Sequence, residues 1–165
     1  MDNMLQTTTA EANAATDNKQ YIVVKIGMEQ YGIDISYVDN IVRMQKITRV
    51  PKSQPYYYGV INLRGEIVPV MSLRRRFNLQ EDEFDGKTRI IILKPEHQES
   101  IGVIVDMVNE VVSFKADDIE KVGLDNKDEL SKYIYGVGQN LENNTLVSIL
   151  NVEAVTTEVK EQQQQ

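Results

Sequence analysis

The sequence contains no cysteine and only one histidine, His97. Without cysteine, the chain can form no disulfide bond, no thiolate metal site and no cysteine nucleophile. The lone histidine lies in a loop-like stretch, KPEHQES, and has no second imidazole with which to build a zinc site or a histidine-dependent triad. The phosphate-binding patterns GxGxxG and GxxxxGKS/T are also missing. We therefore predict a protein that is not an enzyme and that holds no metal or cofactor.

The sequence also lacks long apolar runs and an excess of positive charge. No stretch approaches the about 18 consecutive apolar residues of a membrane span. The N-terminal stretch has neither the basic segment nor the apolar run of a secretory signal, so we expect a cytoplasmic location. A formal charge of −7 and a pI near 4.8 would repel a phosphate backbone. The one dense basic run, residues 74–76, is expected to be a solvated rim rather than a nucleic-acid site.

What the sequence does contain is many short apolar runs rich in valine and isoleucine. Glycine, asparagine or proline separates these runs, which is typical of short strands rather than long helices. One short helix is expected at 37–43, because Ser36 and Asp39 resemble a capping box and Val38, Ile41 and Val42 would share a helical face. Strands are expected at 20–26, 30–35, 44–50, 59–62, 66–73, 88–94, 100–106, 110–115, 136–140 and 145–151.

Two pairs of segments resemble each other and occur in the same order. YGIDISYVDNIV (31–42) aligns with IGVIVDMVNEVV (101–112), which places Gly32 on Gly102 and Val38 on Val108. Further along, GVINLRGEIVPVM (59–71) aligns with GVGQNLENNTLVSIL (136–150). We infer two copies of one β unit of about five strands. Chance similarity between valine-rich strands is the alternative.

The expected fold is mainly β, with two five-stranded lobes from this internal duplication. Each lobe is expected to close into a barrel, because closure removes the exposed edges of a short sheet. The lobes are placed at 19–80 and 88–155 and should pack against each other as one stability unit, with a chain swap or helix packing possible at the ends. A disordered tail at 1–18 and a C-terminal tail at 156–165 complete the chain, because both are poor in apolar residues.

Two kinds of side chain, carboxylates and tyrosines, gather in ways that could hold ligands. Carboxylates gather at 81–85 and 117–129, but neither cluster has the spacing of a calcium loop, so we interpret both as solvated linkers. The run 56–58 of three tyrosines could stack sugars or bases, although packing at a barrel corner is the stronger expectation. Together with the arginines at 74–76, this run leaves open an alternative function, a small β-barrel module that binds a ligand, a sugar or a nucleic acid.

The segment GVINLRGEIVPVMSLRRRFNL (59–79) places the residues NLRG (62–65) at a predicted tight turn before a strand that contains Pro69. With this motif, and with YIVVKIGMEQYGIDI, TRIIILKPEHQESIGVIVDMVNEV and GVGQNLENNTLVSILNVE, the sequence resembles the CheW family of chemotaxis coupling proteins over residues 20–155. The resemblance implies two SH3-like five-stranded barrels and a non-catalytic cytoplasmic adaptor. Such an adaptor couples methyl-accepting chemotaxis receptors, at their cytoplasmic tips, to the regulatory domain of the histidine kinase CheA in membrane-associated arrays.

The resemblance also implies which residues face the receptor: Ile35, Val38, Asn40, Asn62 and Arg64. Many relatives have glutamate where Asn40 stands, so a hydrogen bond or a neutral contact is expected here instead of an ion pair. Val38 fits a core position equally well. Arg64 would present five N–H donors to carboxylates or helix-end carbonyls of a partner, with a solvated arginine paired to Glu66 as the alternative. Gly65 is expected to supply a positive φ angle at the turn.

Overall fold

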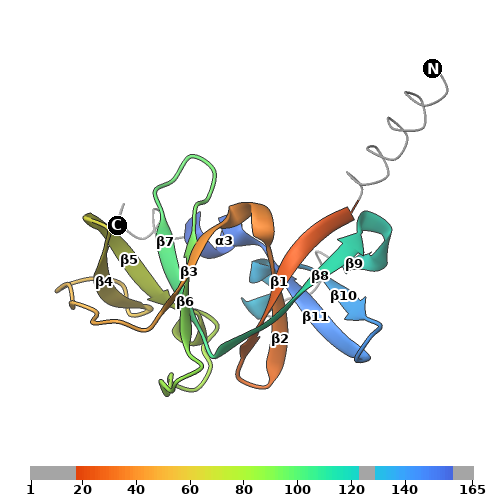
Figure 1. Cartoon of the computed structure of the whole chain (residues 1–165), viewed down its shortest axis with the longest axis horizontal. Helices are drawn as coiled ribbons and strands as arrows, with labels where there is room; N and C mark the ends of the chain where they lie inside the picture. Colours follow the sequence, from red (N-terminus) through yellow and green to blue (C-terminus); the bar gives the residue numbers. More distant parts are fainter. Residues whose placement is uncertain (1–17, 123–128, 158–165) are drawn as a thin grey trace.

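Short strands build almost the whole molecule. The computed structural model describes residues 18–122 and 129–157. The two predicted tails fall mostly outside these ranges, and so do the carboxylates Asp125 and Asp128. Within the described residues the strands form a six-stranded sheet and a five-stranded sheet that lie next to each other (Figure 1). This arrangement confirms the predicted mainly β fold.

Each sheet has an order that differs from the order of its strands in the chain. Across the six-stranded sheet the strands are β8 (Met107–Lys115), β1 (Asn18–Ile26), β2 (Glu29–Asp34), β11 (Thr145–Leu150), β10 (Ile134–Asn140) and β9 (Ile119–Lys121). Across the five-stranded sheet they are β3 (Val38–Arg43), β6 (Arg89–Leu93), β7 (Ile101–Val105), β5 (Glu66–Ser72) and β4 (Tyr57–Leu63).

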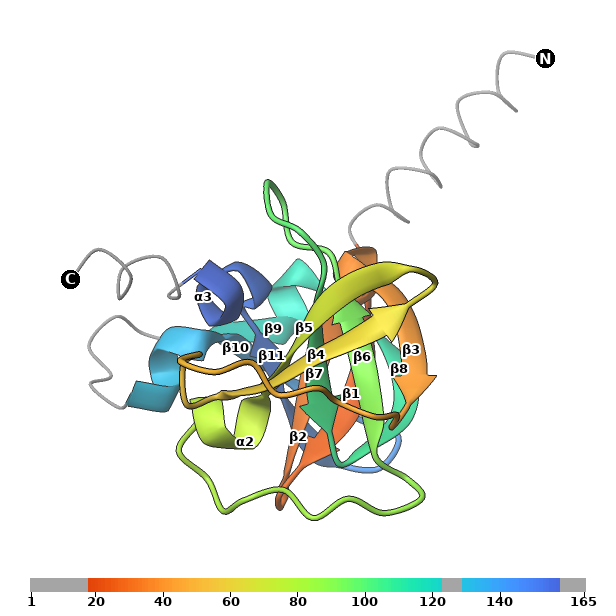
Figure 2. The same cartoon turned by 90° about the vertical axis from the view of Figure 1, so that its left-hand side faces the viewer.

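The helices are short and connect or follow strands. They are the 3-10 helices η1 (Ile35–Tyr37), η2 (Ala116–Asp118) and η3 (Glu129–Tyr133), and the α-helices α2 (Leu73–Arg76) and α3 (Val152–Thr157). Figure 2 shows α2 and α3 on one side of the molecule and the strands β3 and β8 on the opposite side. The face with β3 and β8 is therefore free of these helices.

The two sheets share one central core. Its buried side chains come from the six-stranded sheet, for example Val24 and Ile33, and from the five-stranded sheet, for example Met71 and Val103. Each sheet also has a smaller apolar cluster of its own. Because burial of apolar area is the main stabilising term, about 25 cal/mol per Å², a shared core makes the two sheets interdependent. This agrees with the expectation of one stability unit.

The register of the two sheets repeats and confirms the predicted duplication. In the five-stranded sheet, Val70 pairs with Gly102 between parallel strands. In the six-stranded sheet, the aligned residues Ile149 and Gly32 form the same parallel pair. The order β3-β6-β7-β5-β4 in one sheet therefore corresponds to β8-β1-β2-β11-β10 in the other.

The two copies exchange strands, so the sheets do not follow the predicted lobes at 19–80 and 88–155. The six-stranded sheet combines β1 and β2 with strands β8 to β11, and the five-stranded sheet combines β3 to β5 with β6 and β7. The connections at the crossings are short, since η1 alone separates β2 from β3 and Asp106 alone separates β7 from β8. Corresponding strands of the two copies, such as β2 and β7, have equivalent edges. The same sequence pattern would therefore fit sheets built with or without an exchange of strands between the copies. The consecutive division is thus corrected to two interleaved units.

The segment Val38–Arg43 is a strand, so the helix predicted at 37–43 is wrong. Along β3, half-buried Val38, Asn40 and Val42 alternate with exposed side chains, which is the two-residue period of a strand. Antiparallel pairing with the buried strand β6 satisfies the backbone groups on one of the two sides of β3. The predicted capping pair of Ser36 and Asp39 is not formed; Asp34 caps η1 instead, where its side chain accepts a hydrogen bond of 2.9 Å from the Ser36 backbone N–H.

The strand predicted at 44–50 is reduced to one bridge. Thr48 and Val60 exchange two backbone hydrogen bonds of 2.8 Å each. The bridge joins the segment that follows β3, at one edge of the five-stranded sheet, to β4 at the other edge. Met44 and Ile47 from this segment pack against the apolar cluster of the sheet. The segment therefore covers core rather than extending the sheet.

Candidate binding surfaces

Three of the predicted receptor-facing residues lie together on η1 and β3. Ile35 is exposed, and Val38 is half-buried against the central core, so Val38 serves the core while part of its surface faces outward. The Asn40 side-chain carbonyl accepts a hydrogen bond of 2.8 Å from the Ile41 backbone N–H. Among the described residues the amide nitrogen of Asn40 has no partner, which leaves a neutral donor on this strand.

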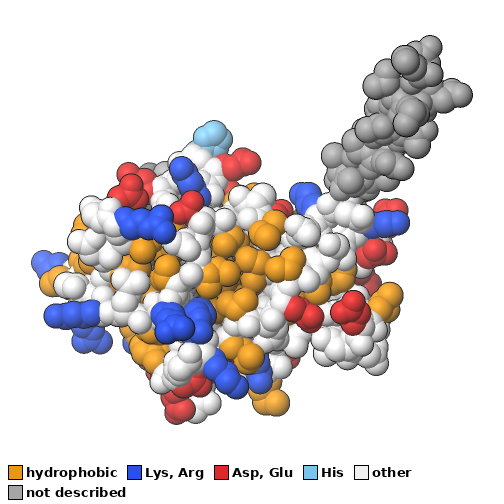
Figure 3. Space-filling view, viewed as in Figure 1, with side chains coloured by type: hydrophobic (Ala, Val, Ile, Leu, Met, Phe, Trp, Pro, Cys, Tyr) orange, Lys and Arg blue, Asp and Glu red, His pale blue; other side chains and the backbone are white. Residues whose placement is uncertain are grey.

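An apolar strip extends from β3 toward β8. Figure 3 shows hydrophobic side chains gathered in the middle of the face on which these two strands lie. Ile41 on β3 and its aligned partner Val111 on β8 are both exposed, and Val108, aligned with Val38, also packs on the central core. The duplication therefore places matching apolar residues on both strands, and the strip can accept an apolar partner surface.

The other two predicted residues, Asn62 and Arg64, lie at the β4–β5 turn. The φ angles of Arg64 and Gly65 are 54° and 84°, and Leu63 pairs with Glu66, so the two residues form the two-residue type I′ turn of a hairpin. Gly65 thus has the positive φ that was predicted. The Asn62 side-chain oxygen accepts a hydrogen bond of 3.0 Å from the Gly65 backbone N–H, which gives Asn62 a structural role in the turn.

The guanidinium of Arg64 is free to meet a partner. No hydrogen bond or ion pair links it to any residue of the described part of the chain, so the pairing with Glu66 that was the alternative is not formed there. An arginine in the left-handed region is uncommon, because only glycine, asparagine and aspartate enter it readily. The turn therefore holds Arg64 in an unfavourable backbone conformation with its side chain unpartnered.

The structure brings the two groups of predicted residues to one end of the sheet but does not place them in contact. β3 and β4 are opposite edge strands of the five-stranded sheet. Because β3 starts opposite the end of β6 and β5 runs parallel to β7, the start of β3 and the β4–β5 turn lie at the same end. A partner would have to span β6 and β7 to contact both groups.

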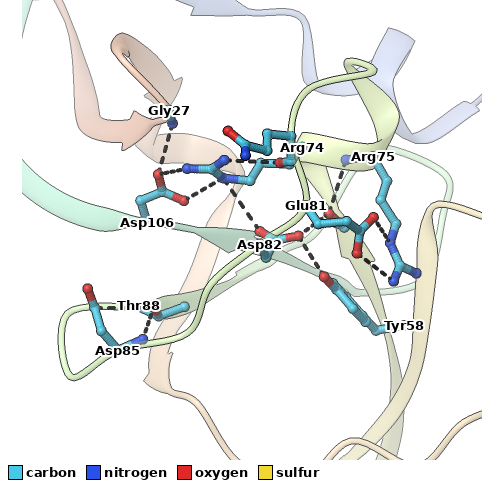
Figure 4. A network of polar contacts seen from close by, with 11 residues as sticks. Gly27, Tyr58, Arg74, Arg75, Glu81, Asp82, Asp85, Thr88 and Asp106 are labelled. Carbon is cyan, nitrogen blue, oxygen red and sulfur yellow. Dashed lines mark hydrogen bonds and ion pairs between the residues drawn. The ribbon is translucent and has the colours of Figure 1, made fainter.

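Arg74 and Arg75 form ion pairs, which corrects the solvated rim predicted at 74–76. Arg74 donates two hydrogen bonds to Asp106, and Arg75 donates two to Glu81, at 2.9 and 3.0 Å (Figure 4). Hydrogen bonds to these carboxylates are the main cause that raises the pKa of each arginine above its ordinary value. The pair between Arg74 and Asp106 could not be predicted locally, because the two residues lie 32 positions apart in the chain.

The tyrosines at 56–58 are also engaged inside the molecule. Tyr56 is buried in the central core, with the guanidinium of Arg76 4.2 Å from its ring centre. The Tyr58 hydroxyl donates a hydrogen bond of 2.7 Å to Asp82, and the Arg75 guanidinium lies 4.1 Å from its ring centre. Burial, followed by that hydrogen bond, raises the pKa of Tyr58 to about 12, so it remains a donor. These rings pack against the protein itself, as the corner-packing interpretation predicted.

A further apolar surface, missed from the sequence, lies at the hairpin end of the six-stranded sheet. Met28 in the β1–β2 turn is 95% exposed, Leu141 in the β10–β11 turn 83%, and Leu146 at the start of β11 65%. β2 and β11 run parallel, so both turns lie at the same end of the sheet. A hydrogen bond of 3.3 Å from the Thr145 hydroxyl to the Gln30 side chain joins the beginnings of the strands β11 and β2. We call these three side chains the hairpin surface.

The described residues contain no cluster of side chains suited to metal binding. His97, the single histidine of the sequence, lies in the β6–β7 connection with a φ angle of 61°. Across residues 18–122 and 129–157, no three histidine, aspartate or glutamate side chains converge as metal ligands. In the same ranges, every helix is too short to cross a membrane.

Comparison with known proteins gives a consistent result. Residues 20–160 match the model of the CheW-like domain. The Chemotaxis protein CheW of Bacillus subtilis is 43% identical over 102 residues, which span 62% of this chain and 65% of the relative. That of Helicobacter pylori is 36% identical over 137 residues, or 82% of this chain and 80% of the relative. The crystal structure of the scaffolding protein TtCheW from Thermoanaerobacter tengcongensis superposes with a TM-score of 0.74 at 28% identity, covering 83% of this chain and 86% of that one.

Proposed function

The chain belongs to the CheW family of chemotaxis scaffolding proteins, and from this membership we propose that it couples chemoreceptors to the histidine kinase CheA. The proposed partners are the cytoplasmic tips of methyl-accepting receptors and the regulatory domain of the kinase. The chain is a non-catalytic adaptor, and its place of action in this proposal is the membrane-associated receptor array. Its contribution is to hold both partners at once.

The observation that supports this role best is the placement of two candidate surfaces at opposite ends of one strand. The turn with Met28 precedes β2, and η1 with Ile35 follows it. β2 spans six residues, so a rigid element of about 20 Å separates the two surfaces. A coupling protein needs two surfaces that do not exclude each other, and this geometry provides them.

The receptor is proposed to contact the end of the five-stranded sheet. Ile35 and Val38 offer apolar contacts, and Asn40 offers a neutral donor to a carbonyl or a carboxylate. Arg64, with Asn62 holding its turn, offers a second contact point with charge. A receptor tip broad enough to span β6 and β7 would engage both points.

The kinase is proposed to dock on the hairpin surface. Met28, Leu141 and Leu146 are apolar, highly exposed and lie at the same end of the six-stranded sheet. Contiguous exposed apolar side chains on a protein mark an interaction site, and a partner of the same fold could pack its own sheet end against them. The contact would be apolar and poor in hydrogen bonds.

The residues that suggested a sugar- or nucleic-acid-binding module are engaged within the protein, which disfavours that alternative. Arg74 and Arg75 are paired with carboxylates. Tyr56 is buried, and half-buried Tyr58 contacts Asp82 and Arg75. With a formal charge of −7, the chain would need free cations at such a site to bind a phosphate backbone.

Co-sedimentation with both partners tests the proposed function. The chain is mixed with a receptor cytoplasmic fragment assembled into pelletable arrays, with the kinase regulatory domain, or with both. A coupling protein should enter the pellet with receptor alone and bring the kinase domain with it, which should otherwise stay in the supernatant. Retention of the kinase domain in the supernatant in the complete mixture would contradict the proposal.

Truncation of Met28 should weaken kinase binding. Met28→Ala removes an almost fully exposed side chain, so the free energy of unfolding should hardly change. At an interface it would remove an anchor that contributes about 1.4 kcal/mol, so the affinity for the kinase regulatory domain should fall about tenfold. Calorimetric titration measures this. Val50→Ala is the matched control, because Val50 is exposed but lies outside both proposed surfaces.

The kinase contact should depend little on salt. Apolar burial is not screened by ions, whereas exposed charge pairs are screened beyond about 10 Å at 0.1 M salt. Raising NaCl from about 0.05 to about 0.5 M should therefore change the affinity of the kinase domain less than about twofold. A steep loss of affinity over that range would show that charged side chains dominate the contact instead of the hairpin surface.

A further inference from the structure

Asp106 forms hydrogen bonds with the turn of the β1–β2 hairpin and with the strand end before it (Figure 4). It is the single residue between β7 of the five-stranded sheet and β8 of the six-stranded sheet. Its side-chain Oδ2 accepts a hydrogen bond of 2.8 Å from the Gly27 backbone N–H. Its own backbone N–H donates a hydrogen bond of 2.9 Å to the Lys25 carbonyl. Asp106 therefore holds the hairpin at two points immediately before Met28.

Arg74 fixes the orientation of the Asp106 carboxylate. The Arg74 Nε donates to Oδ1 at 3.0 Å, and Nη2 donates to Oδ2 at 2.5 Å. From the other side, Nη1 donates to the Gln80 carbonyl at 3.0 Å. A bidentate pair of this kind fixes the geometry of both partners. Because Oδ2 serves both Arg74 and Gly27, the hydrogen bond to the hairpin depends on Arg74.

The other copy of the duplicated unit restrains its hairpin at the same backbone position. The strand register aligns Gly27 with Glu96, because Val23 and Ile92 pair with the aligned glycines of β2 and β7. The Glu96 backbone N–H donates a hydrogen bond of 2.9 Å to the side chain of Glu153 in α3. In each copy a carboxylate therefore accepts the hydrogen bond from this N–H. The helix that follows β5 or β11 holds the carboxylate in place: Arg74 of α2 binds Asp106, and Glu153 belongs to α3 itself.

We propose that the Arg74–Asp106 pair positions the Gly27–Met28 turn for docking to the kinase. This rests on the proposed function, in which Met28 is a docking residue. Met28 is 95% exposed, so packing does not fix the turn. Among the described residues, the bond from Gly27 to Asp106 is the one side-chain hydrogen bond made by this turn. A turn already held in its bound conformation loses less freedom on association, which raises affinity. Arg74 and Asp106 are thus positioning residues that need not touch the kinase.

Arg74→Gln should lower the affinity for the kinase regulatory domain about tenfold, measured by calorimetric titration. Arg75→Gln is the matched control. Arg75 is the next residue of α2 and forms an equally bidentate pair, with Glu81, but makes no hydrogen bond to the β1–β2 hairpin. Arg75→Gln should bind the kinase domain as the unmodified chain does. Equal losses in both variants would overturn the proposal. If Arg74→Gln does not fold, Arg74→Lys replaces it, because lysine keeps the charge without the bidentate geometry.

A double-mutant cycle separates positioning from general destabilisation. If Arg74 acts through Met28, the variant with both Arg74→Gln and Met28→Ala should lose about tenfold in affinity, no more than either single variant. Losses that multiply to about a hundredfold would show that the two residues act independently and would overturn the proposal.

Amide exchange at Gly27, followed by NMR on the full chain, gives a readout that needs no kinase. The exchange rate of the Gly27 N–H should rise at least tenfold in Arg74→Gln and stay unchanged in Arg75→Gln. An unchanged rate in Arg74→Gln would overturn the positioning role. Normal kinase binding by Met28→Ala together with the expected change in Gly27 exchange would contradict the proposed docking surface. It would still support the restraint of the hairpin by Arg74 and Asp106.

Discussion

Gly59→Ala is expected to reduce the free energy of unfolding by more than about 4 kcal/mol, enough to leave little folded protein. A Cβ at this position would lie 2.0 Å from the Thr48 carbonyl oxygen and 2.7 Å from its carbon. The φ angle of Gly59 is 149°, which an alanine rarely adopts. The Thr48 carbonyl accepts a hydrogen bond of 2.8 Å from the Val60 N–H, so it cannot move away without breaking that bond. Urea unfolding followed by circular dichroism measures the loss.

The duplication supplies a second test of the same idea. Gly136 pairs with Ile149 as Gly59 pairs with Val70, and its Cβ would lie 2.7 Å from the Glu120 carbonyl oxygen. Gly136→Ala should therefore be strongly destabilising as well. Gly86→Ala is the control, because nothing lies within 4 Å of its Cβ, and its stability should stay within about 0.5 kcal/mol of the unmodified chain. Unfolding of Gly59→Ala at the same urea concentration as Gly86→Ala would contradict the argument.

A second pair of aligned glycines explains why the duplication could be predicted from the sequence. Gly32 and Gly102 lie where a neighbouring strand leaves no room for a side chain, since a Cβ would come within 2.9 Å of Ile149 and 2.8 Å of Ile90. Such close approaches favour glycine, because any larger residue would displace the neighbouring isoleucine side chain, and both copies have glycine at the same place in a pattern of β-branched residues. The fold class and the repeat were therefore visible in the order of residues.

The exchange of strands could not be predicted in the same way. β2 and β7 are equivalent, and each offers the same edge to β5 or β11. The choice between exchanged and unexchanged copies depends on where the chain runs after η1 and after Asp106, which periodicity does not encode. β3 was mistaken for a helix for a related reason. Val38, Ile41 and Val42 fit the helical period, because exposed Ile41 breaks the alternation of a strand, and pairing with β6 overrides this local pattern.

The candidate surfaces were partly visible and partly hidden. Ile35, Val38, Asn40, Asn62 and Arg64 came from the resemblance to a family, and their roles remain proposals. The hairpin surface was missed because its side chains are single apolar residues in or next to turns, where no pattern marks them. The pair between Arg74 and Asp106 was missed because long-range polar contacts leave no local signal.

Arg64 offers the sharpest test of the receptor surface, because its replacement should affect binding and folding in different directions. Arg64→Ala and Arg64→Asn both remove the guanidinium, so each should lose about 2 to 5 kcal/mol of receptor binding if that group is desolvated in the complex. Alanine is no worse than arginine at a φ of 54°, so Arg64→Ala should change the free energy of unfolding by less than about 1 kcal/mol. Asparagine enters the left-handed region more readily and is preferred before glycine in a type I′ turn, so Arg64→Asn should melt above the unmodified chain.

Ile33→Ala completes this comparison as the variant that damages the core. Ile33 is fully buried in the central core, and its truncation should lower the free energy of unfolding by about 2 to 5 kcal/mol. Thermal unfolding and receptor affinity are measured for all three variants. A melting temperature of Arg64→Ala close to that of Ile33→Ala would make Arg64 a structural residue. Full receptor affinity in Arg64→Asn, which keeps the turn and lacks only the guanidinium, would remove Arg64 from the receptor surface. A chain that melts higher and binds receptor more weakly is the outcome that only a binding role for this arginine predicts.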